Sequence, residues 1–92
     1  MVEESSKPIV VITGVSGYIG SQVCHYFLKD GGFRVRGTVR DKDSEEKIAP
    51  LKVAFGESFK NLELRNANLN DEESLDKAIE GATYLVHTAS PF

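Results

Sequence analysis

Short apolar runs alternate with amphipathic stretches along the chain. The segment Ile9–Thr13 is rich in β-branched residues, and its consecutive apolar positions are typical of a strand that is buried on both faces. The segment Tyr18–Asp30 carries apolar residues at every fourth position from Ile19 to Phe27, which predicts a helix with one apolar stripe. Two glycines follow and favour the end of the helix there, because glycine adopts the left-handed conformation of a helix cap.

The rest of the chain continues the alternation. The predicted segments are a strand over Phe33–Val39, a weaker helix over Asp43–Phe55 capped by Asp43 or Ser44, a strand over Asn61–Ala67, a helix that Asn70 or Asp71 caps and that ends at Glu80, and a strand over Thr83–Thr88. Pro50 is expected to kink or interrupt the second helix, because proline removes a helical hydrogen bond. Strands that alternate with helices in this way indicate parallel βαβ units and an α/β fold.

The polarity of the strands indicates their order in the sheet. The first strand is apolar on both faces and belongs inside, whereas Leu62 and Leu64 alternate with Glu63 and Arg65 and predict an edge strand. With right-handed crossovers, the order 3-2-1-4 satisfies both requirements. This order is that of the N-terminal half of a doubly wound Rossmann sheet.

The fourth strand does not suit an edge position. The residues Tyr84–Val86 are apolar enough for burial on both sides, yet a four-stranded sheet leaves them unprotected. We therefore expect residues 8–92 to be a partial Rossmann domain, truncated at its C-terminus, behind a disordered tail over residues 1–7. Such an exposed strand favours self-association of the fragment through the edge of its sheet.

Composition narrows the class of protein. The 92 residues are 40% hydrophobic and 27% charged, with a net charge of −3, which is ordinary for a globular protein and argues against nucleic acid as a partner. The longest aliphatic run, Ile9 to Ile12, is far too short to span a membrane, and the N-terminus lacks the features of a signal peptide. One cysteine cannot form an intramolecular disulfide, so we expect a cytoplasmic protein with no membrane partner.

A glycine-rich loop stands between the first strand and the first helix. Gly14, Gly17 and Gly20 have the spacing G-x-x-G-x-x-G. In a nucleotide site the first glycine allows the tight turn, the second lets the backbone approach a pyrophosphate, and the third allows close packing of the helix. The free N–H groups at the start of the helix stabilise the phosphates, so the loop predicts a dinucleotide site.

The end of the second strand indicates which dinucleotide binds. A site that selects NAD places Asp or Glu there for the ribose 2′-hydroxyl, but this chain has Val39. Arg40 follows directly and Lys47 comes seven residues later, and both cations suit a 2′-phosphate. We therefore predict NADPH, with Asp41 as the alternative ribose acid if the alignment shifts by a residue or two.

The other titratable residues predict little chemistry. No group of His, Cys, Asp and Glu has the spacing of metal ligands, so we expect no metal site. Cys24 lies on the apolar stripe of the first helix and is expected to be an inert core thiol. His87 is expected to be a strand-end histidine whose hydrogen bonds are satisfied.

Three motifs together resemble one enzyme family. Thr-Gly-x-x-Gly-x-x-Gly, the run Gly37–Asp41 and the run Val86–Pro91 are similar to those of the extended short-chain dehydrogenases/reductases. The branch they resemble holds dihydroflavonol 4-reductase, cinnamoyl-CoA reductase and the methylglyoxal reductases. The resemblance implies a Rossmann domain with a smaller substrate domain, and reduction of aldehydes, ketones or thioesters by NADPH.

The resemblance also implies which residues bind the cofactor. A family pair of Asp and an apolar residue that meets the adenine is replaced here by Asn68 and Leu69. The implied contacts are Gly14, Ser16, Gly17, Tyr18, Ile19 and Gly20 at the pyrophosphate, Arg40 and Lys47 at the 2′-phosphate, Asn68 and Leu69 at the adenine, and Thr88, Ala89 and Ser90 along the riboses.

The family's proton donor is a Tyr-x-x-x-Lys motif, which these 92 residues lack. We therefore expect no catalytic residue in this chain and no turnover by it alone. The leading interpretation is the cofactor-binding part of an NADPH-dependent reductase of a small ketone or aldehyde. The alternatives are a non-enzymatic NADP(H) sensor, an NAD-dependent sugar-nucleotide epimerase, for which Val39 is the wrong residue, and a stand-alone nucleotide-binding module.

Overall fold

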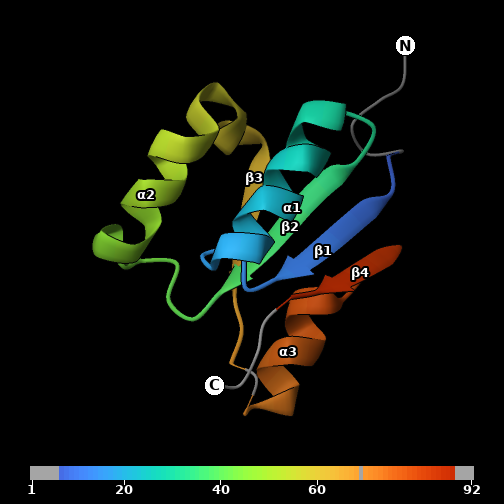
Figure 1. The fold of residues 1–92 in the computed structure, drawn as a ribbon. Coiled ribbons are helices and arrows are strands. Elements are labelled where there is room, and N and C mark those ends of the chain that lie inside the picture. The colour runs from blue at the N-terminus through green and yellow to red at the C-terminus, as the bar shows by residue number, and fades with distance from the viewer. Residues whose placement is uncertain (1–6, 69, 89–92) are drawn as a thin grey trace.

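The computed structural model describes residues 7–68 and 70–88 as a four-stranded parallel sheet with helices on both faces (Figure 1). Its order, β3-β2-β1-β4, confirms the predicted topology. The predicted tail, apart from Lys7, lies outside the described residues. The elements are β1 (Ile9–Thr13), α1 (Tyr18–Asp30), β2 (Arg34–Val39), α2 (Glu45–Phe55), the 3-10 helix η2 (Gly56–Asn61), β3 (Leu62–Asn66), α3 (Glu72–Ile79) and β4 (Tyr84–His87).

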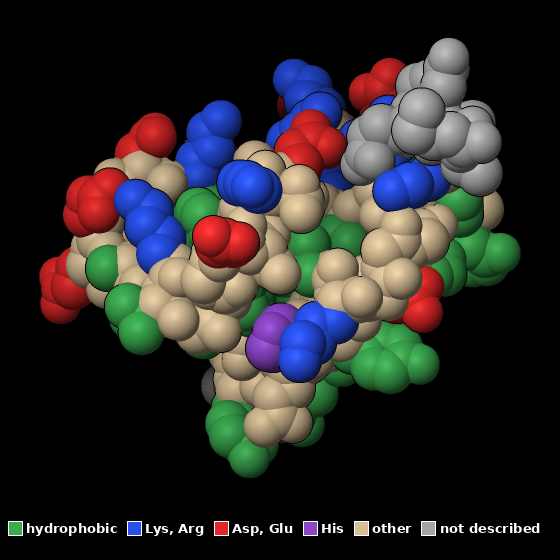
Figure 2. All heavy atoms as spheres, turned by 90° about the horizontal axis from the view of Figure 1, so that it is seen from above, with side chains coloured by type: hydrophobic (Ala, Val, Ile, Leu, Met, Phe, Trp, Pro, Cys, Tyr) green, Lys and Arg blue, Asp and Glu red, His purple; other side chains and the backbone are tan. Residues whose placement is uncertain are grey.

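The helix α2 presents two different surfaces. Ile48, Leu51 and Phe55 are buried beneath it, whereas charged residues of both signs occupy its outer side, where the Lys52 Nζ lies 3.3 Å from a Glu45 carboxylate oxygen. Figure 2 shows these blue and red side chains interspersed rather than gathered into one basic surface.

Pro50 lies inside α2 and does not interrupt it, so the interruption that was one of the two predicted outcomes does not occur. The buried side chains of the helix hold it on the sheet, because tertiary packing supplies most of the stability of a short helix and outweighs one missing hydrogen bond. The helix ends at Gly56, whose φ of +57° belongs to the left-handed region. The 3-10 helix η2 that follows was not predicted, and β3 begins at Leu62.

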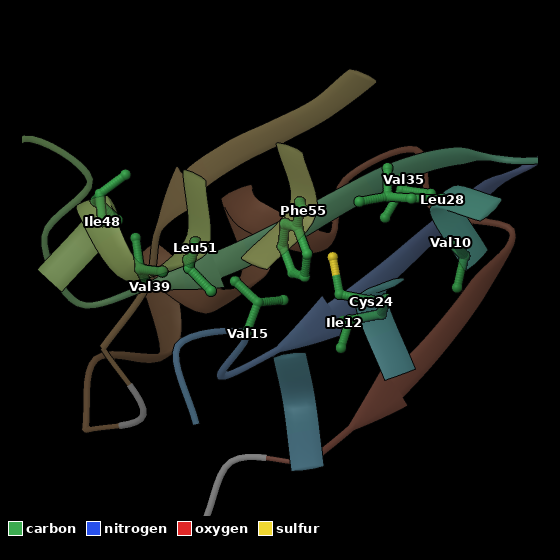
Figure 3. Close-up of a cluster of buried hydrophobic side chains, with 10 residues drawn as sticks. All are labelled: Val10, Ile12, Val15, Cys24, Leu28, Val35, Val39, Ile48, Leu51 and Phe55. Atoms are coloured by element: carbon green, nitrogen blue, oxygen red, sulfur yellow. The ribbon is translucent and has the colours of Figure 1, made fainter. Parts of the chain in front are cut away.

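The core lies between the sheet and the helices α1 and α2. In β1 the side chains of Val10, Val11 and Ile12 have no exposed surface, as expected for a strand that is hydrogen-bonded to neighbours on both sides. Figure 3 shows side chains from β1, β2, α1 and α2 pointing into one cluster, with the Cys24 sulfur among them. Cys24 is fully buried in this cluster, which confirms its predicted core position, and burial raises the pKa of its thiol to about 12, so the reactive thiolate is suppressed.

The opposite face of the sheet is held by a buried arginine. Arg36 follows Val35 in β2, so its side chain points away from α1 and α2. Its guanidinium donates hydrogen bonds to the carbonyl oxygens of Ala78, at 2.9 Å, and Glu80, at 2.7 Å, at the end of α3. Its Nε donates to Glu63 in β3 at 3.0 Å. One side chain therefore caps α3 and joins it to two strands.

The other end of α3 is capped by its own sequence. The Asp71 carboxylate accepts hydrogen bonds from the backbone N–H groups of Glu73 and Ser74 at 3.1 and 3.3 Å, which confirms Asp71 as the cap. The helix then leads through a left-handed Gly81 into β4.

The strand β4 has one unpaired edge in the described chain. Tyr84 and Leu85 are 55% and 50% exposed, although the Tyr84 ring packs edge-on against Phe33 with centroids 6.0 Å apart. The apolar character of β4 thus goes largely unburied here. Self-association through this edge stays a prediction.

Replacing Arg36 by Met should lower the free energy of unfolding by about 1–3 kcal/mol, because the carbonyl groups at the end of α3 lose their buried donor. Urea unfolding followed by circular dichroism measures the change. The control is Arg65→Met, which removes a half-exposed partner of the same Glu63 and should cost less than about 1 kcal/mol. Equal losses in the two variants would contradict the assigned role of Arg36.

Glu63 should make the stability of the fold depend on pH. Burial raises the pKa of its carboxyl, but hydrogen bonds and charge from Arg36 and Arg65 outweigh burial and hold the pKa below its ordinary value of 4.5. The carboxylate therefore adds stability above 4.5, and this contribution is lost as the pH falls through the lowered value. The difference in unfolding free energy between wild type and Glu63→Gln should stay constant near neutral pH and shrink in acid. The matched control is Glu57→Gln on η2, an exposed glutamate that forms no ion pair in the described chain.

Candidate nucleotide-binding site

The carboxyl ends of the four parallel strands meet at one edge of the sheet, as Figure 1 shows for β1, β2 and β4. The loops that follow β1 and β2, the first turn of α1, and residue 88 after β4 carry most of the predicted site residues. In sheets of this kind ligands bind at this edge, beside the strand pair where the order reverses.

The glycine loop is anchored to β2. Gly14 has a φ of +71° and makes the tight turn that was predicted for it. Its N–H donates to Thr38 Oγ1 at 3.1 Å, and the N–H of Val15 donates to the Thr38 carbonyl oxygen, also at 3.1 Å. The Val15 side chain is fully buried against Gly37, where an added Cβ would lie 2.6 Å from a Val15 methyl carbon. Thr38 and Val15 were not among the predicted site residues.

The three glycines of the motif differ in what the chain itself requires. A Cβ on Gly20 would overlap the carbonyl oxygen of Gly14 and lie 2.7 Å from Thr88 Oγ1, so the space at Gly20 supports the close packing expected there. A Cβ on Gly17 would lie 3.4 Å from the Gly14 oxygen, close to an ordinary contact, and its φ of −81° suits any residue. The protein's own packing therefore gives no reason for glycine at position 17.

The start of α1 is open to an anion. Gly17 is the cap residue, and no side chain caps the helix. The first helical bond to the loop runs from the Ser21 N–H to the Gly17 oxygen at 2.9 Å. Within residues 7–68 and 70–88, no acceptor is recorded for the N–H groups of Tyr18, Ile19 and Gly20. These groups form the positive end of the helix dipole, which attracts negative charge.

The two predicted cations lie in the segment that follows β2, one in the loop and one in the first turn of α2. Arg40 directly follows the strand and Lys47 lies near the start of α2, and both side chains are exposed. Val39 is buried in the core, so it offers nothing polar to a ligand. The Asp41 carboxylate accepts a hydrogen bond from the Asp43 N–H at 3.0 Å, a contact within its own loop. That contact disfavours Asp41 as the ribose acid.

The ends of β3 and β4 carry the remaining predicted residues. Asn68 is exposed, and its Oδ1 accepts from the Asn70 N–H at 2.9 Å, which leaves its amide nitrogen for another partner. The Thr88 N–H donates to Thr13 Oγ1 at 3.1 Å, and the Thr88 hydroxyl donates to the Thr13 carbonyl oxygen. The three other residues implied by the resemblance, Leu69, Ala89 and Ser90, lie outside the described residues.

His87 shares a hydrogen bond with Thr13. Its Nδ1 lies 2.9 Å from Thr13 Oγ1, which confirms the prediction of a satisfied histidine at the end of a strand. The same threonine oxygen therefore meets both His87 and Thr88, and it fastens β4 to β1 at the edge where the site lies.

The described part of the chain offers neither a metal site nor a membrane span. There, no three His, Cys, Asp or Glu side chains lie together in a way that could hold a metal ion. None of the described helices is long and apolar enough to cross a membrane.

Curated proteins are similar to this chain in sequence. Dihydroflavonol 4-reductase of Dianthus caryophyllus is 40% identical over 82 residues, which are 89% of this chain and 22% of that protein. Cinnamoyl-CoA reductase CAD2 of Medicago truncatula is 38% identical over 84 residues, or 91% of this chain and 25% of that protein. The chain thus spans about a quarter of the length of these curated relatives.

The fold of this chain is similar to that of a solved reductase structure. The yeast methylglyoxal/isovaleraldehyde reductase complexed with NADPH has a TM-score of 0.70 and 26% identity, over 91% of this chain and 25% of that one. The model of the NAD dependent epimerase/dehydratase family matches residues 10–91. This match covers most of the sheet and the whole glycine loop, and the chain therefore belongs to the NAD dependent epimerase/dehydratase family.

Proposed function

We propose that this chain is the N-terminal, cofactor-binding part of an NADPH-dependent reductase that acts on a ketone or aldehyde. The observation that carries the proposal is the pairing of an uncapped α1 terminus with an exposed Arg40 after the buried Val39. The relatives named above are reductases, and the yeast enzyme was solved with NADPH.

The uncapped helix terminus suits the pyrophosphate of the cofactor. The N–H groups of Tyr18 and Ile19 lack acceptors in the described chain, and the side chains of both residues are exposed. The open space at Gly17 lets a phosphate oxygen approach the backbone, which a side chain would prevent. Ser16, also exposed, lies beside this path and can donate its hydroxyl proton to a phosphate oxygen.

The cations after β2 suit the 2′-phosphate. A guanidinium can donate two parallel hydrogen bonds to one phosphate, so Arg40 supplies the specific contact and Lys47 adds positive charge. Asn68 and Thr88 complete the site at the adenine and the riboses. Thr88 can offer a ribose only the lone pairs of its hydroxyl oxygen, because its proton is donated to Thr13.

Bound NADPH would supply a hydride to the carbonyl carbon of the substrate. The residues of this chain would bind and orient the cofactor at the sheet edge, and the proton for the carbonyl oxygen would come from a Tyr-x-x-x-Lys motif, which these 92 residues do not contain. Reduction is favoured over epimerisation because Val39 leaves no carboxylate where NAD would be selected. A cytoplasmic location and a partial Rossmann domain over residues 8–92 belong to the same proposal.

Gly17→Ala should separate ligand binding from folding. The added methyl group fits the free protein, so the melting temperature should hold, whereas affinity for NADPH should fall at least about tenfold because the methyl group meets the pyrophosphate. Gly20→Ala is the contrast, and it should cost about 1–3 kcal/mol of stability because its methyl group overlaps Gly14. NADPH fluorescence and thermal unfolding measure the two effects. Tight NADPH binding by Gly17→Ala would place the pyrophosphate elsewhere.

Arg40→Ala should weaken NADPH binding about 10- to 100-fold, the range for lost hydrogen bonds to a charged group, and change NADH binding far less. Titrations with the two nucleotides measure the ratio of their dissociation constants. Lys60→Ala is the control, because this exposed cation of η2 lies close to the amino end of β3, whereas the site lies at the carboxyl ends of the strands. Equal losses for NADPH and NADH would refute the assignment of Arg40.

A further inference from the structure

We propose that Asn66 is a positioning residue for cofactor choice, which holds the loop Arg40–Ser44 so that Arg40 faces the 2′-phosphate. The inference rests on the proposed function of Arg40. It concerns a residue that was not among the predicted site residues and that follows Arg65 at the end of β3.

The contact is a single hydrogen bond between two strand ends. The backbone N–H of Lys42 donates to Asn66 Oδ1 at 2.6 Å. Asn66 pairs with Val39 in the sheet, so its side chain emerges beside the strand residue that immediately precedes Arg40. The N–H of Ala67 donates to the Val39 carbonyl oxygen at 2.9 Å, which fixes the backbone of β3 at this point.

The loop has few other restraints. The Asp43 N–H bonds to the Asp41 carboxylate at 3.0 Å, and the Ser44 N–H bonds to the Asp41 carbonyl oxygen at 3.2 Å. Both of these bonds lie within the loop and shape its turn without fastening it to the sheet. The side chains of residues 40–43 are all exposed, so none is anchored in the core. In the described chain, the bond to Asn66 is the one recorded hydrogen bond that joins this loop to another strand.

The chemistry of asparagine suits this place. A backbone N–H needs an acceptor, and an aspartate would provide one together with a negative charge close to the expected phosphate. Asn66 provides the oxygen without that charge. A loop that is held by one neutral acceptor keeps its cation in place without opposing the anion, which favours NADPH over NADH.

The test replaces Asn66 by Leu, which has a similar volume and no acceptor, and by Ala as a second variant. The control is Asn61→Leu, at the last residue of η2 directly before β3, where the side chain is also exposed. Amide hydrogen exchange of Lys42 reports the bond in the free protein, and titrations give the affinities for NADPH and NADH. We expect faster exchange at Lys42 and NADPH affinity lowered about five- to tenfold, the range for one hydrogen bond, with NADH affinity within about twofold.

Two results would overturn the inference. Equal losses for NADPH and NADH would mean that Asn66 acts on the fold in general, and unchanged NADPH affinity with faster exchange would mean that the bond does not position Arg40. Arg40→Ala is titrated alongside. If Arg40→Ala leaves the ratio of the NADPH and NADH dissociation constants unchanged, the proposed function fails with the inference. If Arg40→Ala changes this ratio and the Asn66 variants do not, the inference fails alone.

Discussion

The start of α1 sits against the end of β1 because residue 20 has no side chain. The Gly14 carbonyl and the Thr88 hydroxyl occupy the space that a Cβ would need, and Thr88 is in turn hydrogen-bonded to Thr13. One close approach thus joins the first helix to the ends of two strands. It leaves the open helix terminus at the carboxyl ends of β1 and β4, where Gly14 is also hydrogen-bonded to Thr38 of β2.

The two faces of the sheet are held by different forces. Apolar packing of α1 and α2 buries one face, and its strength follows the area removed from water. On the other face, where Val11 and Ala78 are buried, Arg36 adds directional bonds to α3 and to Glu63. Hydrogen bonds depend on distance and direction more strongly than apolar contacts do. They therefore fix the position of α3 on the sheet, although Ala78 is its one buried residue in the described chain.

Local sequence predicted the strands and α-helices, the strand order and the glycine motif, because each depends on periodicity or on residues that are close in the chain. It did not predict the partners of Arg36, Thr38 and Asn66, which act across strands whose register no local pattern defines. The interruption expected at Pro50 does not occur because the buried face of α2 outweighs the propensity of one residue. Val15 could have been identified from the sequence, because an apolar residue within a polar glycine loop indicates a side chain that anchors the loop in the core.

The loop after β2 can change its charge without disturbing the fold. Its side chains lie in solvent, and its one recorded bond to another strand uses the main chain at Lys42. Substitutions at positions 40, 41 and 43 can therefore alter the charge offered to a nucleotide at little cost in folding energy. The charge at this end of the sheet and the stability of the fold therefore depend on different residues, the first on this exposed loop and the second on the buried β1 and the turn at Gly14.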